Sequence, residues 1–306
     1  MRQANRSRLG ERWSVAGGLA LIEKGSERMA ISGYPIPVTE RAVHANGIDF
    51  WYVEAGAGVP LLLLHGGTVS NGPLWTGHKY GWGAHLAALA KHFHVIALDT
   101  RGHGRTRNPS GELSYRLYAE DLLAVIEALE LDRPLIAGFS DGGTTATILG
   151  MIAPEVPRAI VDYAGYQTFN PDPDASNYRR LRNWFGGSPN ATKLDYDHFS
   201  SDLVDPQRHI DDFEPTQGAG YFRTYIEQIF TFWTKPMEFT YADYPRITAP
   251  MLMLVGDRDP SCSLADGVEL YQKLPQGELG VVPGACHEVT SLGRDMMLDY
   301  LRRHQD

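Results

Sequence analysis

The sequence predicts an α/β fold, in which helices cover both faces of a mostly parallel, doubly wound sheet and a helical cap is inserted between two strands. Segments with the unbroken apolar character of buried parallel strands alternate with segments of helical periodicity. One long stretch, residues 168–246, breaks this alternation and contains no obvious buried strand. A chain of 306 residues is long for one domain and short for two, which favours one large domain with an insertion.

The predicted core comprises residues 42–167 and 247–306. Its strands are expected at 48–53, 60–64, 94–98, 134–139, 159–163, 251–255 and 279–282. Helices are expected over 114–130, from about residue 141, and over roughly 289–303. This order of strands and helices is typical of a parallel sheet covered on both faces.

Residues 168–246 are predicted to form the cap, because a segment of this length is not a structureless loop in a compact domain. It opens on a polar, proline-containing run over 170–174, and apolar residues between 222 and 233 recur at helical spacing. Four aromatic residues of the cap are candidates for lining a substrate pocket, with packing between cap and core as the alternative: Trp184, Tyr221, Phe232 and Trp233.

Residues 1–41 are predicted to form an N-terminal extension that is partly disordered. Its arginines and the apolar run over 13–22 follow the order of a secretory signal. However, Glu11 lies in the basic region and no small-residue cleavage site follows. A start at Met29 is one interpretation, and the sequence leaves open whether residues 1–28 belong to the working protein.

Charge and cysteine content restrict the partners and the compartment. The net charge of −9 disfavours nucleic acid and anionic membrane surfaces, and no apolar run approaches the length of a membrane span. Cys262 and Cys286 form no disulfide framework and no zinc-ligand cluster, so two free thiols in a reduced, cytoplasmic protein are expected. We expect a small-molecule substrate, no metal and no other cofactor. Oligomeric state is not indicated.

The motif Gly-Phe-Ser-Asp-Gly-Gly at 138–143 carries the strongest chemical signal. It follows an apolar strand and opens a helix, which is the context of a nucleophile elbow with Ser140 as nucleophile. A serine on such a sharp turn takes a strained backbone angle, and its glycine neighbours let strand and helix approach closely. The helix N-terminus then directs free amides at developing negative charge.

Two further strand ends complete one side of this site. His65-Gly66-Gly67 follows the strand 60–64, where an oxyanion-hole amide is expected. We predict that the amides of Gly67 and Asp141 form the oxyanion hole. The motif Asp-Thr-Arg-Gly-His-Gly at 99–104 is interpreted as a structural turn whose charges are satisfied locally, so His103 is not a catalytic candidate.

The base and the acid are expected after Ser140 in the chain. His287 follows the strand 279–282 and precedes the last helix, which distinguishes it among eleven histidines. Asp257 and Asp259 both follow the strand 251–255. Catalytic groups gather at the carboxyl ends of strands in open α/β sheets. His287 would take the proton from Ser140, with one of the two carboxylates orienting its ring.

Together these motifs, spread from His65 to His287, resemble those of the α/β-hydrolase superfamily and imply its fold. The resemblance implies Asp259 as the acid, three residues after the strand-end glycine. The Ser-Asp-Gly-Gly form and Gly-Asp-Arg-Asp-Pro at 256–260 are most similar to the biphenyl-hydrolase-like or valacyclovirase branch. There the aspartate after the nucleophile is associated with binding a substrate amino group. Asp141 matches that position, and a helix-start carboxylate favoured by the dipole is the alternative.

The predicted function is hydrolysis of a small carboxylic ester, lactone or amide through an acyl-serine intermediate. A slow-turnover ligand receptor of the same fold is one alternative. Hydrolysis of a C–C bond and cofactor-free perhydrolysis are two others, because they share the triad and differ only in pocket shape.

Overall fold

The computed structural model describes residues 33–306, apart from residues 78 and 204. Residues 1–32, and with them most of the predicted N-terminal extension, lie outside the described part of the chain. Strand β1 begins at Thr39, so the sheet includes the last residues of the segment predicted to precede the core.

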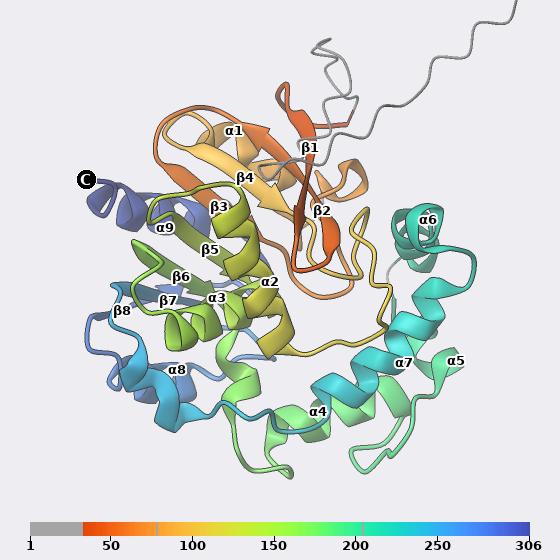
Figure 1. Ribbon diagram of the computed structural model, residues 1–306. Coiled ribbons are helices and arrows are strands. Elements are labelled where there is room, and N and C mark those ends of the chain that lie inside the picture. Colours follow the sequence, from red (N-terminus) through yellow and green to blue (C-terminus); the bar gives the residue numbers. More distant parts are fainter. Residues whose placement is uncertain (1–32, 78, 204) are drawn as a thin grey trace, which may run out of the picture.

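Within the described residues, the core is one sheet of eight strands in the order β1-β2-β4-β3-β5-β6-β7-β8 (Figure 1). The strands are β1 (Thr39–Ala45), β2 (Ile48–Ala55), β3 (Pro60–Leu64), β4 (His94–Leu98), β5 (Leu135–Phe139), β6 (Ala159–Tyr163), β7 (Met251–Gly256) and β8 (Gly277–Val282). β2 pairs antiparallel with β1 and β4, and all other neighbours are parallel. The prediction of a mostly parallel sheet is confirmed.

β1 is the strand that the sequence analysis did not predict. It lies at the edge of the sheet and, among the described strands, pairs with β2 alone. Only Val43 and Ala45 among its seven residues are buried. An edge strand covered this little has a weak apolar pattern, whereas the central strands β3 and β5 are unbroken apolar runs.

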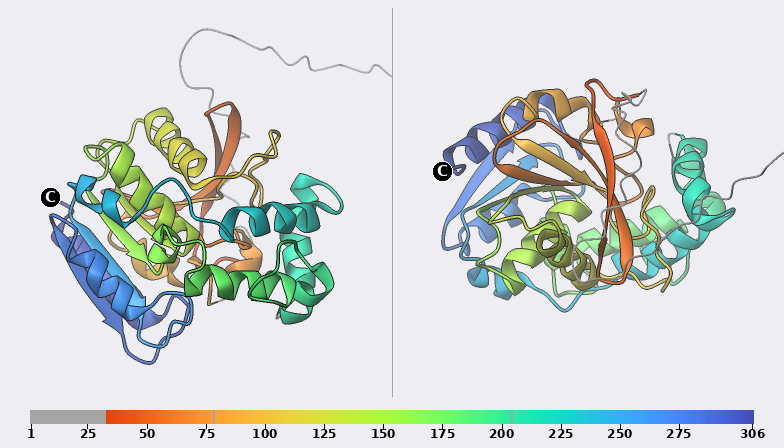
Figure 2. Two further views of the ribbon diagram at one scale, coloured as in Figure 1. Left: turned by 90° about the horizontal axis from the view of Figure 1, so that it is seen from below. Right: turned by 45° about the horizontal axis from the view of Figure 1, so that its top comes forward.

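The helices of the core cover both faces of the sheet. They are α1 (Leu86–Leu89), α2 (Tyr115–Ala128), α3 (Asp141–Ile152), α8 (Leu264–Tyr271) and α9 (Ser291–Arg303). α2 and α3 lie together on one face, and α1 and α9 lie on the other (Figure 2). Nearly every residue of α3 is buried, because its sequence is small or apolar on all sides. The sheet is therefore doubly wound.

In the described part of the chain, four further α-helices lie between β6 and β7, within residues 168–246. They are α4 (Ser176–Gly186), α5 (Tyr196–Asp202), α6 (Pro206–Gln217) and α7 (Tyr221–Trp233), joined to the core through short 3₁₀ turns at Tyr166–Phe169 and Tyr241–Arg246. They gather beside the sheet (Figure 1) and share a hydrophobic cluster that includes Phe185, Phe199 and Phe213. We keep the name cap for these helices.

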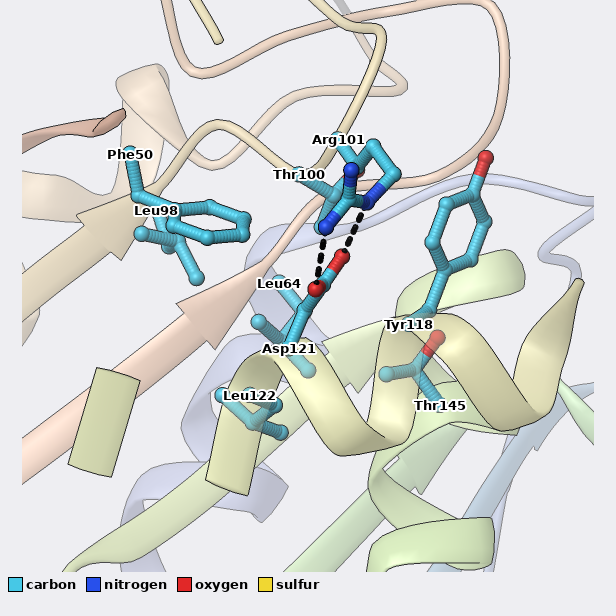
Figure 3. Close-up of a pocket in the computed structure, with 9 residues that line it drawn as sticks. All are labelled: Phe50, Leu64, Leu98, Thr100, Arg101, Tyr118, Asp121, Leu122 and Thr145. Carbon is cyan, nitrogen blue, oxygen red and sulfur yellow. Dashed lines mark hydrogen bonds and ion pairs between the residues drawn. The ribbon is translucent and has the colours of Figure 1, made fainter. Parts of the chain in front are cut away.

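The motif at 99–104 is tied into the core by buried charges. Arg101 makes two hydrogen bonds of 2.7 Å to the carboxylate of Asp121 on α2, beside a cavity of about 10 Å³ (Figure 3). Asp99 accepts hydrogen bonds from the backbone of Asn71 and from Arg105. The charges are thus satisfied, although the partner of Arg101 comes from a helix rather than from within the turn.

Candidate active site

Ser140 lies on the turn between β5 and α3, with φ of 53° and ψ of −117°. A positive φ is strained for any residue with a side chain. The Ser140 N–H donates a 2.8 Å hydrogen bond to the Tyr163 carbonyl, which holds the turn in place. Gly142 lets α3 start against β3, since a Cβ there would lie 2.4 Å from the Leu64 carbonyl oxygen. The N–H groups of the first turn of α3 have no acceptor within the helix.

His287 and Asp259 complete a chain of hydrogen bonds that starts at Ser140. The Ser140 Oγ lies 3.0 Å from His287 Nε2, and His287 Nδ1 lies 2.9 Å from Asp259 Oδ2. The Asp259 side chain is fully buried, whereas that of His287 is 21% exposed. The Phe139 ring packs beside the imidazole, with 4.9 Å between the ring centroids.

The neighbouring aspartate, Asp257, has a different environment. It is exposed, and its Oδ1 accepts a 2.6 Å hydrogen bond from the Gly284 N–H. Asp259 Oδ1 instead accepts from the N–H groups of Ser261 and Cys262, which leaves Oδ2 directed at the imidazole. The structure therefore brings Asp259, and not Asp257, to His287.

The loop that follows β3, residues 65–75, lies against the turn that carries Ser140, and we call it the β3 loop. A Cβ on Gly66 would lie 3.3 Å from the Cβ of Ser140. A Cβ on Gly67 would lie 2.6 Å from Asp141 Oδ2. Both residues predicted for the oxyanion hole, Gly67 and Asp141, are thus adjacent.

Asp141 is a buried carboxyl with one oxygen held and one not. Tyr115 Oη donates a 2.6 Å hydrogen bond to its Oδ1. Oδ2 receives no hydrogen bond from the described residues, although the Trp233 N–H lies near enough to lower the pKa of the carboxyl. Burial outweighs these effects and raises the pKa of Asp141 to about 7.

The four aromatic candidates from the cap lie in different environments. Trp233 lies on Gly67, since a Cβ on that glycine would be 2.2 Å from its Cζ2. Phe232 packs on Tyr115, with 4.4 Å between ring centroids. Trp184 packs at tilted and edge-on angles against Phe185 and Phe199 within the cap. Tyr221 donates a hydrogen bond to the Gly102 carbonyl.

Two side chains near the site carried no signal in the sequence. Tyr115 holds Asp141 from the start of α2, 26 positions earlier in the chain. Arg180 of α4 lies close enough to Cys262 and Asp259 for these two residues to raise its pKa, although burial lowers the pKa more. Neither residue lies in a recognisable motif.

Asp259, Cys262 and His287 could together hold a metal ion, since one ligand atom from each lies within 4.8 Å of the others. Two of these three residues, Asp259 and His287, also share the hydrogen bond described above. Cys262 is buried and Cys286 is exposed, and neither forms a disulfide within the described part of the chain. No helix in the described part of the chain combines the length and apolar character needed to cross a membrane.

The sequence of this chain is similar to those of known hydrolases. The sequence model of the alpha/beta hydrolase family matches residues 61–298. A 2-hydroxy-6-oxo-6-(2'-aminophenyl)hexa-2,4-dienoic acid hydrolase of Metapseudomonas resinovorans is 33% identical over 123 residues, which cover 40% of this chain and 41% of that protein. Serine hydrolase BPHL of Mus musculus is 24% identical over 268 residues, covering 85% of this chain and 84% of that protein.

A solved structure of similar fold is that of a thermophilic esterase from Thermogutta terrifontis. It has a TM-score of 0.65 and 18% sequence identity, and the match covers 88% of this chain and all of that one, at 100%. The similarity to BPHL agrees with the branch that the Ser-Asp-Gly-Gly motif resembles. The match of the family model to most of the sequence is decisive: this chain belongs to the alpha/beta hydrolase family.

Proposed function

We propose that the protein hydrolyses small carboxylic esters, lactones or amides through an acyl-Ser140 intermediate. The observation that carries this proposal is the hydrogen-bonded chain from Ser140 Oγ through His287 to Asp259. Its members come from three strand ends of one sheet, and Ser140 lies at the N-terminus of α3. The cap, residues 168–246, is assigned to substrate selection.

In the first half of the reaction, Ser140 Oγ attacks the substrate carbonyl while His287 Nε2 takes the serine proton. The Asp259 carboxylate accepts from Nδ1–H, which holds Nε2 as the base and stabilises the imidazolium that forms. The Gly67 and Asp141 amides stabilise the negative oxygen of the tetrahedral intermediate. His287 then returns its proton to the departing alcohol or amine.

In the second half, water attacks the acyl-Ser140 ester. His287 takes a proton from the water, and the second tetrahedral intermediate collapses to release the carboxylic acid. The proton returns to Ser140 Oγ, so the enzyme is regenerated without any other reactant.

Turnover of p-nitrophenyl acetate and butyrate by the wild type and by Ser140→Ala tests the proposal. We expect hydrolysis by the wild type that collapses in the variant. Equal rates in both proteins would exclude Ser140 as the nucleophile. Absence of hydrolysis in both, with tight binding of a ligand, would favour the receptor alternative.

Asp141 supports a finer proposal, a preference for substrates with an α-amino group. Its Oδ2 is buried beside Gly67 without a hydrogen bond from the described residues, and a cationic amine would satisfy it. The preference for an α-amino ester over its des-amino analogue should disappear in Asp141→Ala, while simple ester hydrolysis is largely kept. An unchanged preference would contradict this role.

Hydrolysis of a C–C bond in a dienoic acid is the second candidate function. It is favoured by the 33% identity to the hydrolase of Metapseudomonas resinovorans, within the part of the chain that aligns. Turnover of a 2-hydroxy-6-oxo-2,4-dienoic acid, measured beside the p-nitrophenyl esters, separates the two candidates. A kcat/KM far above that for the esters would replace the ester proposal.

A further inference from the structure

Thr68, the residue after Gly67, has a backbone conformation that a β-branched side chain disfavours. Its φ is 63°, which is strained for a β-branched residue. Both polar groups of its backbone are bonded to the cap: the N–H donates to Tyr225 Oη of α7 at 3.2 Å, and the carbonyl accepts from His209 Nδ1 of α6 at 2.7 Å. The strained conformation is thus maintained by two cap helices.

These bonds bear on the direction of the Gly67 N–H. The Gly66 carbonyl, which shares a peptide group with that N–H, accepts a 2.7 Å hydrogen bond from His65 Nδ1. Because the C=O and N–H of one trans peptide point in opposite directions, this bond orients the Gly67 N–H from the side of the core. The following peptide group is held by Tyr225 through the Thr68 N–H. Gly67 therefore lies between one peptide held by the core and one held by the cap.

The buried His103 sets the direction of the Tyr225 hydroxyl. Its Nδ1 lies 3.1 Å from the Arg101 carbonyl, which can only accept, so Nδ1 carries the proton. Burial first, and then neighbouring His65, hold the pKa of His103 well below its ordinary value, so the ring is neutral. Its Nε2 accepts from Tyr225 Oη at 2.7 Å, which leaves the Tyr225 oxygen free to accept the Thr68 N–H.

α6 binds the same loop at a second point. Asp212 lies one turn after His209, and its carboxyl accepts hydrogen bonds of 2.8 Å from Ser70 Oγ and from Trp75 Nε1. The β3 loop is thus fastened to the cap near both of its ends. The core alone supplies no partner of this kind for the Thr68 N–H and carbonyl among the described residues.

We propose that His103, Tyr225 and His209 are positioning residues that couple the cap to the oxyanion hole by holding the Gly67–Thr68 backbone. This inference rests on the proposed function, since it needs Gly67 to stabilise an oxyanion. It gives a role to His103, which the reaction itself does not use. We call the hydrogen bonds that join His103, Tyr225 and His209 to Thr68 the latch. Its loss should lower kcat, because the oxyanion forms only in the transition state.

Tyr225→Phe removes the hydroxyl and keeps the ring. We expect kcat to fall by about 10- to 100-fold, with a smaller change in KM, because a displacement of about 1 Å at a catalytic group costs up to roughly 100-fold. Tyr178→Phe is the matched control: Tyr178 is also a buried cap tyrosine, but its hydroxyl donates to the Asn170 carbonyl. Wild-type kcat in Tyr225→Phe, or an equal loss in Tyr178→Phe, would overturn the proposal.

His209 provides an independent variant. His209→Asn places an amide N–H near the position of Nδ1 and should retain most of the wild-type kcat, whereas His209→Leu has no donor and should lose activity as Tyr225→Phe does. Thermal unfolding followed by circular dichroism verifies that each variant is folded. Equal kcat in His209→Asn and His209→Leu would contradict a hydrogen-bonding role.

The rate of amide hydrogen exchange at Thr68, measured by NMR, reports on the hydrogen bond from the Thr68 N–H to Tyr225 without any substrate. We expect exchange to become at least about tenfold faster in Tyr225→Phe and to stay unchanged in Tyr178→Phe. Unchanged exchange in Tyr225→Phe would overturn the latch even where kcat falls. A different experiment tests the proposed function: if that function is wrong, the wild type and Ser140→Ala hydrolyse the p-nitrophenyl esters at equal rates.

Discussion

The two sides of Ser140 are built from different parts of the molecule. On one side, His287 and Asp259 come from loops that directly follow β8 and β7, and the hydrogen bonds that join them lie within the core. On the other side, Thr68 of the β3 loop is held by His209 and Tyr225, which are 141 and 157 positions away in the chain.

This difference indicates which parts of the site the sheet alone determines. Parallel strands bring their carboxyl ends to one edge, so Ser140, His287 and Asp259 meet there through contacts of the core. The β3 loop has a strained residue, Thr68, whose partners belong to the cap. We infer that changes in the cap act on oxyanion stabilisation, and not on the hydrogen bonds from Ser140 to Asp259.

The largest effect is expected on the core side, from Asp259→Asn. The amide keeps the shape of the carboxyl but favours the wrong tautomer of His287, so kcat should fall by about 10,000-fold. Steady-state hydrolysis of p-nitrophenyl butyrate measures it. Asp257→Asn is the control, since Asp257 is exposed and contacts Gly284 instead. Comparable losses in both variants would refute the assignment of Asp259.

An intermediate effect is expected on the β3-loop side, from Gly67→Ala. The added Cβ would lie 2.2 Å from Cζ2 of Trp233, closer than any real contact, so the loop or the ring must move. Because this displaces a proposed oxyanion donor, kcat should fall on the order of 100-fold. Gly77→Ala is the control, since no described atom beyond its chain neighbours lies within 4 Å of its Cβ position. A Gly67→Ala enzyme with normal kcat would remove the amide from the mechanism.

The contrast between the two sides also explains what could be predicted from the sequence. Apolar runs such as 60–64 and 135–139 mark buried strands, and Ser140 and His287 stand out because they follow such runs. Spacing alone did not separate Asp257 from Asp259, because both follow β7 and only the turn geometry decides which one faces His287.

Contacts between cap and core left no comparable trace in the sequence. The partners Tyr225 and His103 lie 122 positions apart, and neither belongs to a pattern that pairs them. The short helix α8 was missed as well, since eight residues span little more than two turns. The edge strand β1 was missed because few of its residues are buried.

The smallest effect is a pH dependence of stability that originates where the cap meets the β3 loop. Burial, and then the negative charge of Asp99, raise the pKa of Asp212 from 3.8 to about 7. The folded protein therefore retains this proton more strongly than the unfolded chain does. The resulting stability is fully present below about pH 3.8 and is lost as the pH rises through about 7.

We therefore expect the wild-type Tm to decline between about pH 5 and pH 8, and the decline to be smaller in Asp212→Asn, which has no proton to lose. Part of the decline in Tm should remain in that variant, because the pKa of Asp141 is also raised to about 7. Asp211→Asn changes the exposed neighbour on the same helix and should leave the profile unchanged. Thermal unfolding followed by circular dichroism across this range measures the three profiles. An undiminished decline in Asp212→Asn would show that the contact between α6 and the β3 loop does not depend on the ionisation of this carboxyl.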